Sequence, residues 1–226
     1  MINILLEQKK LLIQKNIKQH EIQSERYVKE RYGVSEAVFC PRKNYFIRAK
    51  GDIPEPNGKM ITGTLFHTMI PVALKEYPGI TNPKFEQECR LDITDEFGTY
   101  SIIGHSDVLC DEKVLEFKFT KLYKRKPVSE YYFYQANMYC YLQDRPEYEI
   151  ITIDKDDLAV EIYSSNRDED KYKEILENVK LTWQGLNKGI PPEKGPMYDW
   201  ECNYCPYQSD CRKERTEVVM RKTGLI

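Results

Sequence analysis

Hydrophobic and polar residues alternate with a period of two in several short segments of the chain. The segments 84–93, 99–110 and 114–120 follow one another with only short, turn-like connections between them. Alternation of this kind is typical of strands that bury one face, so the three segments predict a meander. Two further strands are expected at 148–154 and 158–164.

A helical period near 3.6 residues dominates most of the remaining chain. It predicts helices at 61–77, 129–143 and 168–187, and a broken apolar stripe predicts one or two more helices before residue 33. The Pro- and Cys-rich tail after residue 190 is predicted to be irregular. Strands interspersed with helices favour an α/β fold, with a mixed central sheet flanked by helices.

One domain with extensions is the simplest organisation for 226 residues. We expect an N-terminal helical extension at 1–32 and a single domain at 33–226, whose core spans about 60–190. Cysteine-bearing stretches at about 34–50 and 196–215 flank that core.

The composition allows a packed core beneath a charged surface, since 41% of residues are hydrophobic and 31% are charged. A net charge of −2 argues against a protein that coats nucleic acid by bulk charge, but it leaves room for a local basic groove. The sequence contains no run of 18 or more apolar residues and no secretory signal at its start. We therefore expect a cytoplasmic protein that does not enter a membrane.

The third strand of the meander carries charged residues on one face. Leu115 and Phe117 point to one side, whereas Glu116 and Lys118 share the other, and Asp107 lies near the end of the preceding strand. Adjacent strands lie about 4.8 Å apart, so the two carboxylates can converge on one cation. Oxygen ligands suit Mg²⁺ or Mn²⁺. The plainer interpretation is a solvated strand face with an ordinary ion pair.

Lys118 and His67 extend this set toward catalysis. An ammonium beside the cation could orient or polarise a water, and a histidine nitrogen would favour Mn²⁺ somewhat over Mg²⁺. Together the groups suit metal-assisted hydrolysis of a phosphodiester. A histidine considered alone is more often a satisfied core residue.

The pattern resembles the RecB-like branch of the PD-(D/E)XK nuclease superfamily. The matching motifs, in chain order, are GTLFH (63–67), GHSD (104–107), EFK (116–118) and QANMY (135–139). The resemblance implies a restriction-endonuclease-like core and a metal-dependent DNA nuclease.

The resemblance also assigns roles by position. It implies that the divalent cation is bound by His67, Asp107, Glu116 and the backbone carbonyl of Phe117, and that Lys118 is catalytic. Gln135 and Tyr139 would support the site and contact DNA.

The seven cysteines point to a metal or cluster rather than to disulfides, since their number is odd. Cys202, Cys205 and Cys211 form C-x2-C-x5-C, and Cys40 can supply a fourth thiolate if the two ends of the chain meet. Four thiolates suit Zn²⁺ or an iron–sulfur cluster, and the spacing does not choose between them, although structural zinc is commoner. The remaining cysteines are expected in the core: Cys89, Cys110 and Cys140.

The resemblance favours the cluster over zinc. RecB-like nucleases with one cysteine before the nuclease motifs and three in a CxxCPYxxxC-like tail carry an iron–sulfur cluster, here expected as 4Fe-4S rather than 2Fe-2S. Helicase-nuclease subunits and small CRISPR-associated exonucleases share this arrangement. A short chain without a P-loop fits the CRISPR-associated family better.

That family implies single-stranded DNA exonuclease activity in CRISPR spacer acquisition, with the CRISPR integrase complex as a partner and homo-oligomers in some members. Other interpretations stay open. The chain could be a DNA-binding or adaptor protein that has lost turnover, a zinc-stapled nuclease, or a RecB-like nuclease of a virus or mobile element outside CRISPR.

Two basic stretches suggest where the phosphates of DNA would bind. The first runs directly out of the third strand, and a second lies beside Cys40 and contains Arg42, Lys43, Arg48 and Lys50. The cations expected to contact DNA in the first stretch are Lys121, Lys124, Arg125 and Lys126.

Overall fold

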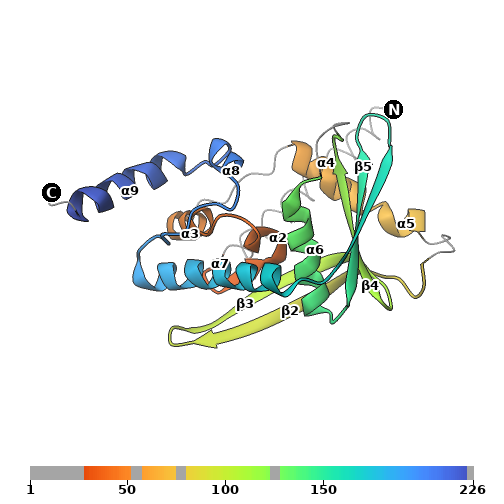
Figure 1. The fold of residues 1–226 in the computed structure, drawn as a ribbon, viewed down its shortest axis with the longest axis horizontal. Helices are drawn as coiled ribbons and strands as arrows, with labels where there is room; N and C mark the ends of the chain where they lie inside the picture. Colours follow the sequence, from red (N-terminus) through yellow and green to blue (C-terminus); the bar gives the residue numbers. More distant parts are fainter. Residues whose placement is uncertain (1–27, 52–57, 75–79, 123–127, 223–226) are drawn as a thin grey trace, which may run out of the picture.

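The computed structural model describes residues 28–51, 58–74, 80–122 and 128–222. Within them the chain forms an α/β fold with a mixed sheet flanked by helices, as the sequence predicts (Figure 1). The strands are β1 (Arg31–Gly33), β2 (Lys84–Asp95), β3 (Gly98–Leu109), β4 (Lys113–Thr120), β5 (Glu147–Asp154) and β6 (Val160–Asn166). The five predicted strands all occur, with boundaries within about two residues.

The helices agree less closely with the sequence-based expectation. The helix predicted at 61–77 is divided into α4 and α5, and the tail predicted to be irregular contains α8 and α9. The tail after Pro206 consists largely of residues with good helix propensity, and this outweighs the irregular composition before it. The described helices are α2 (Val34–Ala37), α3 (Pro41–Lys50), α4 (Gly58–His67), α5 (Ile70–Leu74), α6 (Glu130–Leu142), α7 (Glu169–Lys188), α8 (Trp200–Asn203) and α9 (Gln208–Lys222).

The sheet forks at β3. Its path runs β1-β3-β4-β5-β6, with β2 paired antiparallel along β3. On the other side, β3 pairs with β1 through residues 101–103, but with β4 only through Val108 and Leu109. The strands β3 and β4 therefore diverge immediately before Val108, and the space between them opens at the level of Asp107.

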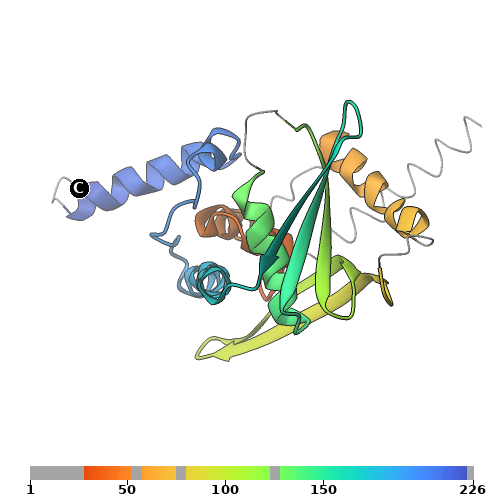
Figure 2. The ribbon, with the colours of Figure 1, turned by 45° about the vertical axis from the view of Figure 1, so that its right-hand side comes forward.

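Helices cover both faces of the sheet, so β4 is buried on both sides. The helix α6 connects the parallel strands β4 and β5 and packs on one face with α2 and α7, while α4 and α5 pack on the other. In Figures 1 and 2, α9 extends away from the sheet on the side opposite α4 and α5. Leu115 and Phe117 point into the core beneath α4 and α5, as the alternation predicts.

The three cysteines assigned to the core are buried. Cys89 and Cys140 lie in the cluster between the sheet and α6, and Cys110 lies in the cluster on the opposite face. The predicted N-terminal helices fall almost wholly outside the described residues. Among the helices that are described, none has the length and apolar character needed to cross a membrane.

Gly104 in β3 permits the close approach of α6 that places the candidate site. A Cβ atom there would lie 2.8 Å from a ring carbon of Tyr139 and 2.8 Å from Val34. We expect Gly104→Ala to lower the free energy of unfolding by about 1–3 kcal/mol, because neither neighbour can retreat in a packed core. Urea unfolding measures the effect. Gly63→Ala is the control, since its Cβ meets nothing within 4 Å, and an equal loss there would refute the packing argument.

Candidate active site

The candidate site lies at the fork between β3 and β4. Asp107 faces Glu116 across the gap, beyond the last ladder pair of Val108 with Leu115. The Asp107 carboxylate takes over the role of a ladder partner, because its Oδ2 accepts a hydrogen bond of 2.7 Å from the backbone N–H of Phe117. This hydrogen bond therefore holds the Asp107 carboxylate in place at the fork, opposite Glu116.

Glu116 and Lys118 form a buried pair on the face beneath α6. The Lys118 ammonium donates to Glu116 Oε1 at 2.5 Å and to Gln135 Oε1 at 3.1 Å, and it lies 5.2 Å from the centre of the Tyr132 ring. Glu116 is only 1% exposed, and its second oxygen, Oε2, has no hydrogen-bond partner. A buried carboxylate oxygen without a partner is costly, so a ligand at this position would relieve the cost.

The electrostatics of this pair follow from its burial. Burial and the nearby Asp107 carboxylate raise the pKa of Glu116 to about 7, although Lys118 partly offsets them. Burial alone lowers the pKa of Lys118, but the charges of Glu116 and Asp107 outweigh it and the net shift is upward. The lysine therefore remains an ammonium, while the carboxyl of Glu116 retains a proton up to near neutral pH.

His67 reaches the same carboxylate from the C-terminal end of α4. Its Nδ1 lies 2.8 Å from Asp107 Oδ1, and the imidazole is about one quarter exposed. Burial lowers the pKa of His67, but the hydrogen bond to Asp107 and the charge of that carboxylate raise it by more. The structure thus brings together His67, Asp107, Glu116 and Lys118. The sequence motifs predict these four residues, which span 51 positions of the chain.

Glu86 is a residue of this site that the sequence analysis missed. It lies in β2 directly opposite Asp107, and ligand atoms of His67, Glu86 and Asp107 all lie within 4.8 Å of one another. Such a group can hold a divalent cation. The register of the hairpin contains the missing signal: Phe85 pairs with Val108 and Gln87 with Ser106, so Glu86 must face Asp107.

The QANMY motif lies in α6, above the sheet. Gln135 contacts the site directly through Lys118. Tyr139 is 4% exposed and packs against Gly104, and its burial raises its pKa well above the usual value. Tyr139 also forms a side-chain hydrogen bond with Gln135, so it both packs against β3 and supports the residue that contacts Lys118.

The basic stretches are only partly described, and one differs from expectation. Lys121 is exposed and lies 2.8 Å from Asp156, whereas Lys124, Arg125 and Lys126 fall outside the described residues. The expectation that the second stretch forms a phosphate-binding surface is wrong, because acidic residues pair with three of its four cations. These ion pairs are Arg42 with Glu214, Arg48 with Glu36 and Lys50 with Asp210. Arg42 and Arg48 are buried at the side chain, so they do not line an open phosphate groove.

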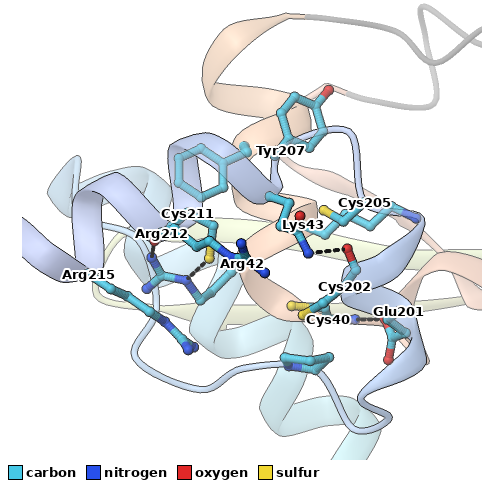
Figure 3. A pocket seen from close by; sticks show the side chains of 13 residues that line it. Cys40, Arg42, Lys43, Glu201, Cys202, Cys205, Tyr207, Cys211, Arg212 and Arg215 are labelled. Atoms are coloured by element: carbon cyan, nitrogen blue, oxygen red, sulfur yellow. Dashed lines mark hydrogen bonds between the residues drawn. The ribbon is translucent and has the colours of Figure 1, made fainter.

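The four terminal cysteines meet around one cavity of about 140 Å³ (Figure 3). Cys40 precedes α3, Cys202 lies in α8, and Cys205 and Cys211 follow it along the chain. The ends of the chain are joined there by a hydrogen bond of 2.9 Å from the Cys40 backbone N–H to Glu201. All four cysteines therefore line one cavity, and their binding of a common metal or cluster stays a prediction.

Positive charge surrounds the sulfur atoms. The Arg42 guanidinium donates from Nε to Cys211 Sγ at 3.0 Å, and Lys43, Arg212 and Arg215 also line the cavity. Burial raises the pKa of the Cys40 thiol to about 11 in the metal-free protein. Among the described residues, no three of these sulfurs lie within 4.8 Å of one another, so the thiols do not form an assembled ligand set in this structure.

Solved structures resemble this fold. The crystal structure of SSO0001 matches with a TM-score of 0.66 at 21% identity, over 89% of this chain and 94% of that one. An alkaline exonuclease from Laribacter hongkongensis, LHK-Exo, matches with a TM-score of 0.52 at 16% identity, over 76% of this chain and 94% of its own. LHK-Exo in complex with dAMP gives 0.51 at 18% identity over the same shares. No protein-family model matches the sequence, and no curated protein does.

These likenesses establish the fold, which this chain shares with the alkaline exonuclease LHK-Exo. Within that fold, His67, Glu86 and Asp107 form a group that can hold a divalent cation.

The raised pKa of Glu116 gives a pH dependence for metal binding. If Glu116 is a ligand, a cation must displace the proton from its carboxyl, so this group alone raises the affinity for Mn²⁺ about tenfold per pH unit below its pKa of about 7. His67 acts in the same direction, since it must lose its proton to become a ligand. Calorimetric titration at several pH values measures the effect. A variant in the adjoining turn, Glu112→Gln, should keep it, and an affinity independent of pH would exclude Glu116 from the metal site.

Proposed function

We propose that this protein is a metal-dependent DNA nuclease, chiefly a single-stranded DNA exonuclease that carries an iron–sulfur cluster. The observation that carries the proposal is the convergence of His67, Asp107, Glu116 and Lys118 at the fork of a sheet whose fold resembles that of exonucleases. Structural elements that are far apart in sequence supply these side chains, with His67 in contact with Asp107 and Lys118 in contact with Glu116.

The proposed cation ligands are His67, Asp107, Glu116 and the backbone carbonyl of Phe117. The unpartnered Oε2 of buried Glu116 supports this fit, because a cation would satisfy it. When bound, a divalent ion supplies Lewis-acid stabilisation of the phosphoryl oxygens and lowers the pKa of a water.

Lys118 would orient that water and stabilise the developing negative charge. Its upward-shifted pKa keeps it cationic, and Gln135 and Glu116 fix the position of its ammonium. Because the pair is buried under α6, its interaction with a transferred phosphoryl group would be strong. Gln135 therefore acts as a positioning residue in this proposal, with Tyr139 packed behind it.

The terminal cysteines would hold the iron–sulfur cluster, with 4Fe-4S favoured. A zinc ion with four sulfurs at about 2.3 Å requires neighbouring sulfurs about 3.8 Å apart. A cavity of about 140 Å³ lined by all four cysteines has room for a larger group. Four thiolates also carry more negative charge than one cation cancels, and the arginines around the cavity would offset the remainder.

DNA is the proposed substrate, with single strands favoured. The complex of LHK-Exo with dAMP, a mononucleotide, supports DNA as the polymer for this fold. The CRISPR-associated type of RecB-like exonuclease remains the proposed family, and spacer acquisition with the CRISPR integrase complex the proposed setting, on the strength of the four cysteines and the motif order. We propose Lys121, Lys124, Arg125 and Lys126 as phosphate contacts.

Binding and cleavage measured together test this proposal. A single-stranded oligonucleotide labelled at either end is incubated with the anaerobically purified protein, with Mn²⁺ or with a chelator. We expect binding in both conditions and cleavage only with Mn²⁺. Binding without cleavage in Mn²⁺ would indicate an adaptor of the same fold. The metal content of the same preparation tests the cluster, and zinc in place of iron would refute it.

A further inference from the structure

The strand β6 forms an edge of the sheet in the described part of the chain. It is the last strand on the path and pairs with β5 alone, and five of its seven residues are exposed. Proteins usually protect such an edge from other strands with charged residues or proline. The strand β2, which pairs with β3 alone, has this protection, since it contains six charged residues. By contrast, β6 has no proline and a single charged residue, Glu161, so its edge is left able to pair.

Alternate residues of β6 direct their backbone groups outward. At one end of the ladder an N–H of β5 donates to the Ala159 carbonyl at 2.8 Å, and at the other the Arg167 N–H donates at 2.9 Å to the residue before β5. Hydrogen-bonded pairs alternate along an antiparallel ladder, so the odd-numbered residues of β6 direct their N–H and C=O groups at β5. The backbone groups of Val160, Ile162 and Ser164 therefore point away from the sheet.

The same positions carry exposed apolar side chains. Val160 is 56% and Ile162 61% exposed. They lie opposite Ile153 and Ile151 of β5, two partly buried residues on the face of the sheet that α4 and α5 cover farther along. The edge therefore combines outward backbone groups with apolar side chains, which is the combination that an added strand covers.

We propose that two copies of this chain pair through β6 in an antiparallel arrangement, with the two-fold axis at Ile162. In this register Ile162 lies opposite its counterpart and Val160 lies opposite Ser164 of the second copy, so the outward backbone groups form three hydrogen-bonded pairs. Glu161 then faces Tyr163 of the second copy, and a phenol can donate to a carboxylate. Moving the axis to Glu161 would instead set two carboxylates against each other, which destabilises a sheet.

Charges at the two ends of β6 complement each other in this register. Arg167 follows the strand, with 43% of its side chain exposed beside Asp144, and Asp157 is exposed in the turn before the strand. Both lie five residues from Ile162. Antiparallel pairing around Ile162 therefore brings Arg167 of each copy to the level of Asp157 of the other, and opposite charges meet at both ends of the contact.

The dimensions of the contact predict a reversible dimer. A strand of this length spans about 23 Å, so the contact is smaller than a standard interface of about 800 Å² per partner, and we expect a Kd on the order of 10 µM. Five strand spacings of about 4.8 Å separate the β4 strands of the two copies. The two candidate active sites would then lie about 24 Å apart on one continuous sheet.

Sedimentation velocity of the full chain over a range of concentrations tests the pairing. We expect a monomer–dimer equilibrium in the wild type. Ser164→Pro should raise the dissociation constant about tenfold or more, because proline removes an outward N–H and places its ring on the edge. Ile162→Lys should do the same without changing the backbone. Val72→Lys is the matched control, since this α5 side chain is 78% exposed away from β6, and it should dimerise like the wild type.

Engineered cysteines test the register. The Cα atoms of a hydrogen-bonded antiparallel pair lie about 5.5 Å apart, a distance that a disulfide spans. Ile162→Cys should therefore form a disulfide-linked dimer under mild oxidation. Val160→Cys should not, because the two copies of this residue would lie about 13 Å apart along the strands. The wild type, with its native cysteines, gives the background.

Three results would overturn the pairing through β6: a wild-type protein that stays monomeric at about ten times the expected Kd, a folded Ser164→Pro and Ile162→Lys pair of variants that dimerise like the wild type, or a monomer whose β6 amides are protected from hydrogen exchange. The last would show that another segment of the same chain covers the edge. A disulfide in Val160→Cys but not in Ile162→Cys would overturn the register. None of these measurements depends on DNA cleavage, so their failure is distinct from failure of the proposed function.

Discussion

Replacing Lys118 by alanine is expected to lower the rate of single-stranded DNA cleavage by about 10²–10⁴-fold. The ammonium is the cation that contacts both Glu116 and Gln135, and a methyl group cannot orient water or stabilise charge. DNA affinity should change little, because the buried Lys118 side chain is only 15% exposed. Single-turnover cleavage and fluorescence anisotropy, measured on the same preparation, separate the two effects.

Lys113→Ala is the matched control for this prediction. Lys113 lies on the same strand and forms an ion pair of 2.7 Å with Glu149, away from the fork. Its removal should leave the rate unchanged. Removing the Lys118 ammonium also leaves the Glu116 carboxyl without its ion-pair partner, which favours the protonated form of that carboxyl. The midpoint of thermal unfolding of Lys118→Ala must therefore be compared with that of the wild type. A folded Lys118→Ala protein that cleaves like wild type would remove Lys118 from the chemistry.

Replacing Cys205 by alanine is expected to remove the visible absorbance of the anaerobically purified protein and to lower its thermal stability. A cluster bound by Cys40 and the tail would close a loop of more than 160 residues. A cross-link over a loop of this size stabilises by about 4–5 kcal/mol, which corresponds to a fall of roughly 10 °C or more for a chain of this length. Iron analysis and circular dichroism melting measure the two effects.

Other contacts also join the two ends of the chain around the cavity. We therefore expect Cys205→Ala to lose part of its thermal stability rather than to unfold globally. Arg42 pairs with Glu214, and Phe46 stacks on Tyr207 at a centroid distance of 6.0 Å. Cys110→Ala is the control, because this buried cysteine lies outside the cavity and its replacement should keep the colour and the iron. A fully coloured Cys205→Ala protein would exclude Cys205 as a ligand.

The sheet could be predicted well because its signal is local. Each strand from β2 to β6 spans at least seven residues, and the turns between β2, β3 and β4 are short, so the antiparallel pairing of these three strands follows from the sequence. Alternation also places Glu116 and Lys118 on the same face. Periodicity did not predict the fork. On the side where it diverges from β4, β3 pairs with β1, and β1 is a three-residue strand with little pattern of its own.

The residues that were missed or misjudged depend on distant contacts. The cations of α3 resembled a phosphate-binding stretch, but the acids that neutralise Arg42 and Lys50 lie in α9, near the other end of the chain. Glu86 is one of two glutamates in the alternating strand β2. Only the register that sets it opposite Asp107, with a left-handed backbone conformation at this residue, distinguishes it.

Cleavage of end-labelled single-stranded DNA by the wild-type protein, with Mn²⁺ and then with excess chelator, tests the central claim most directly. The account requires metal-dependent release of short products, progressing from one labelled end, that stops when the metal is removed. Intact DNA after prolonged incubation with Mn²⁺, in a preparation that is folded and still binds the oligonucleotide, would contradict it.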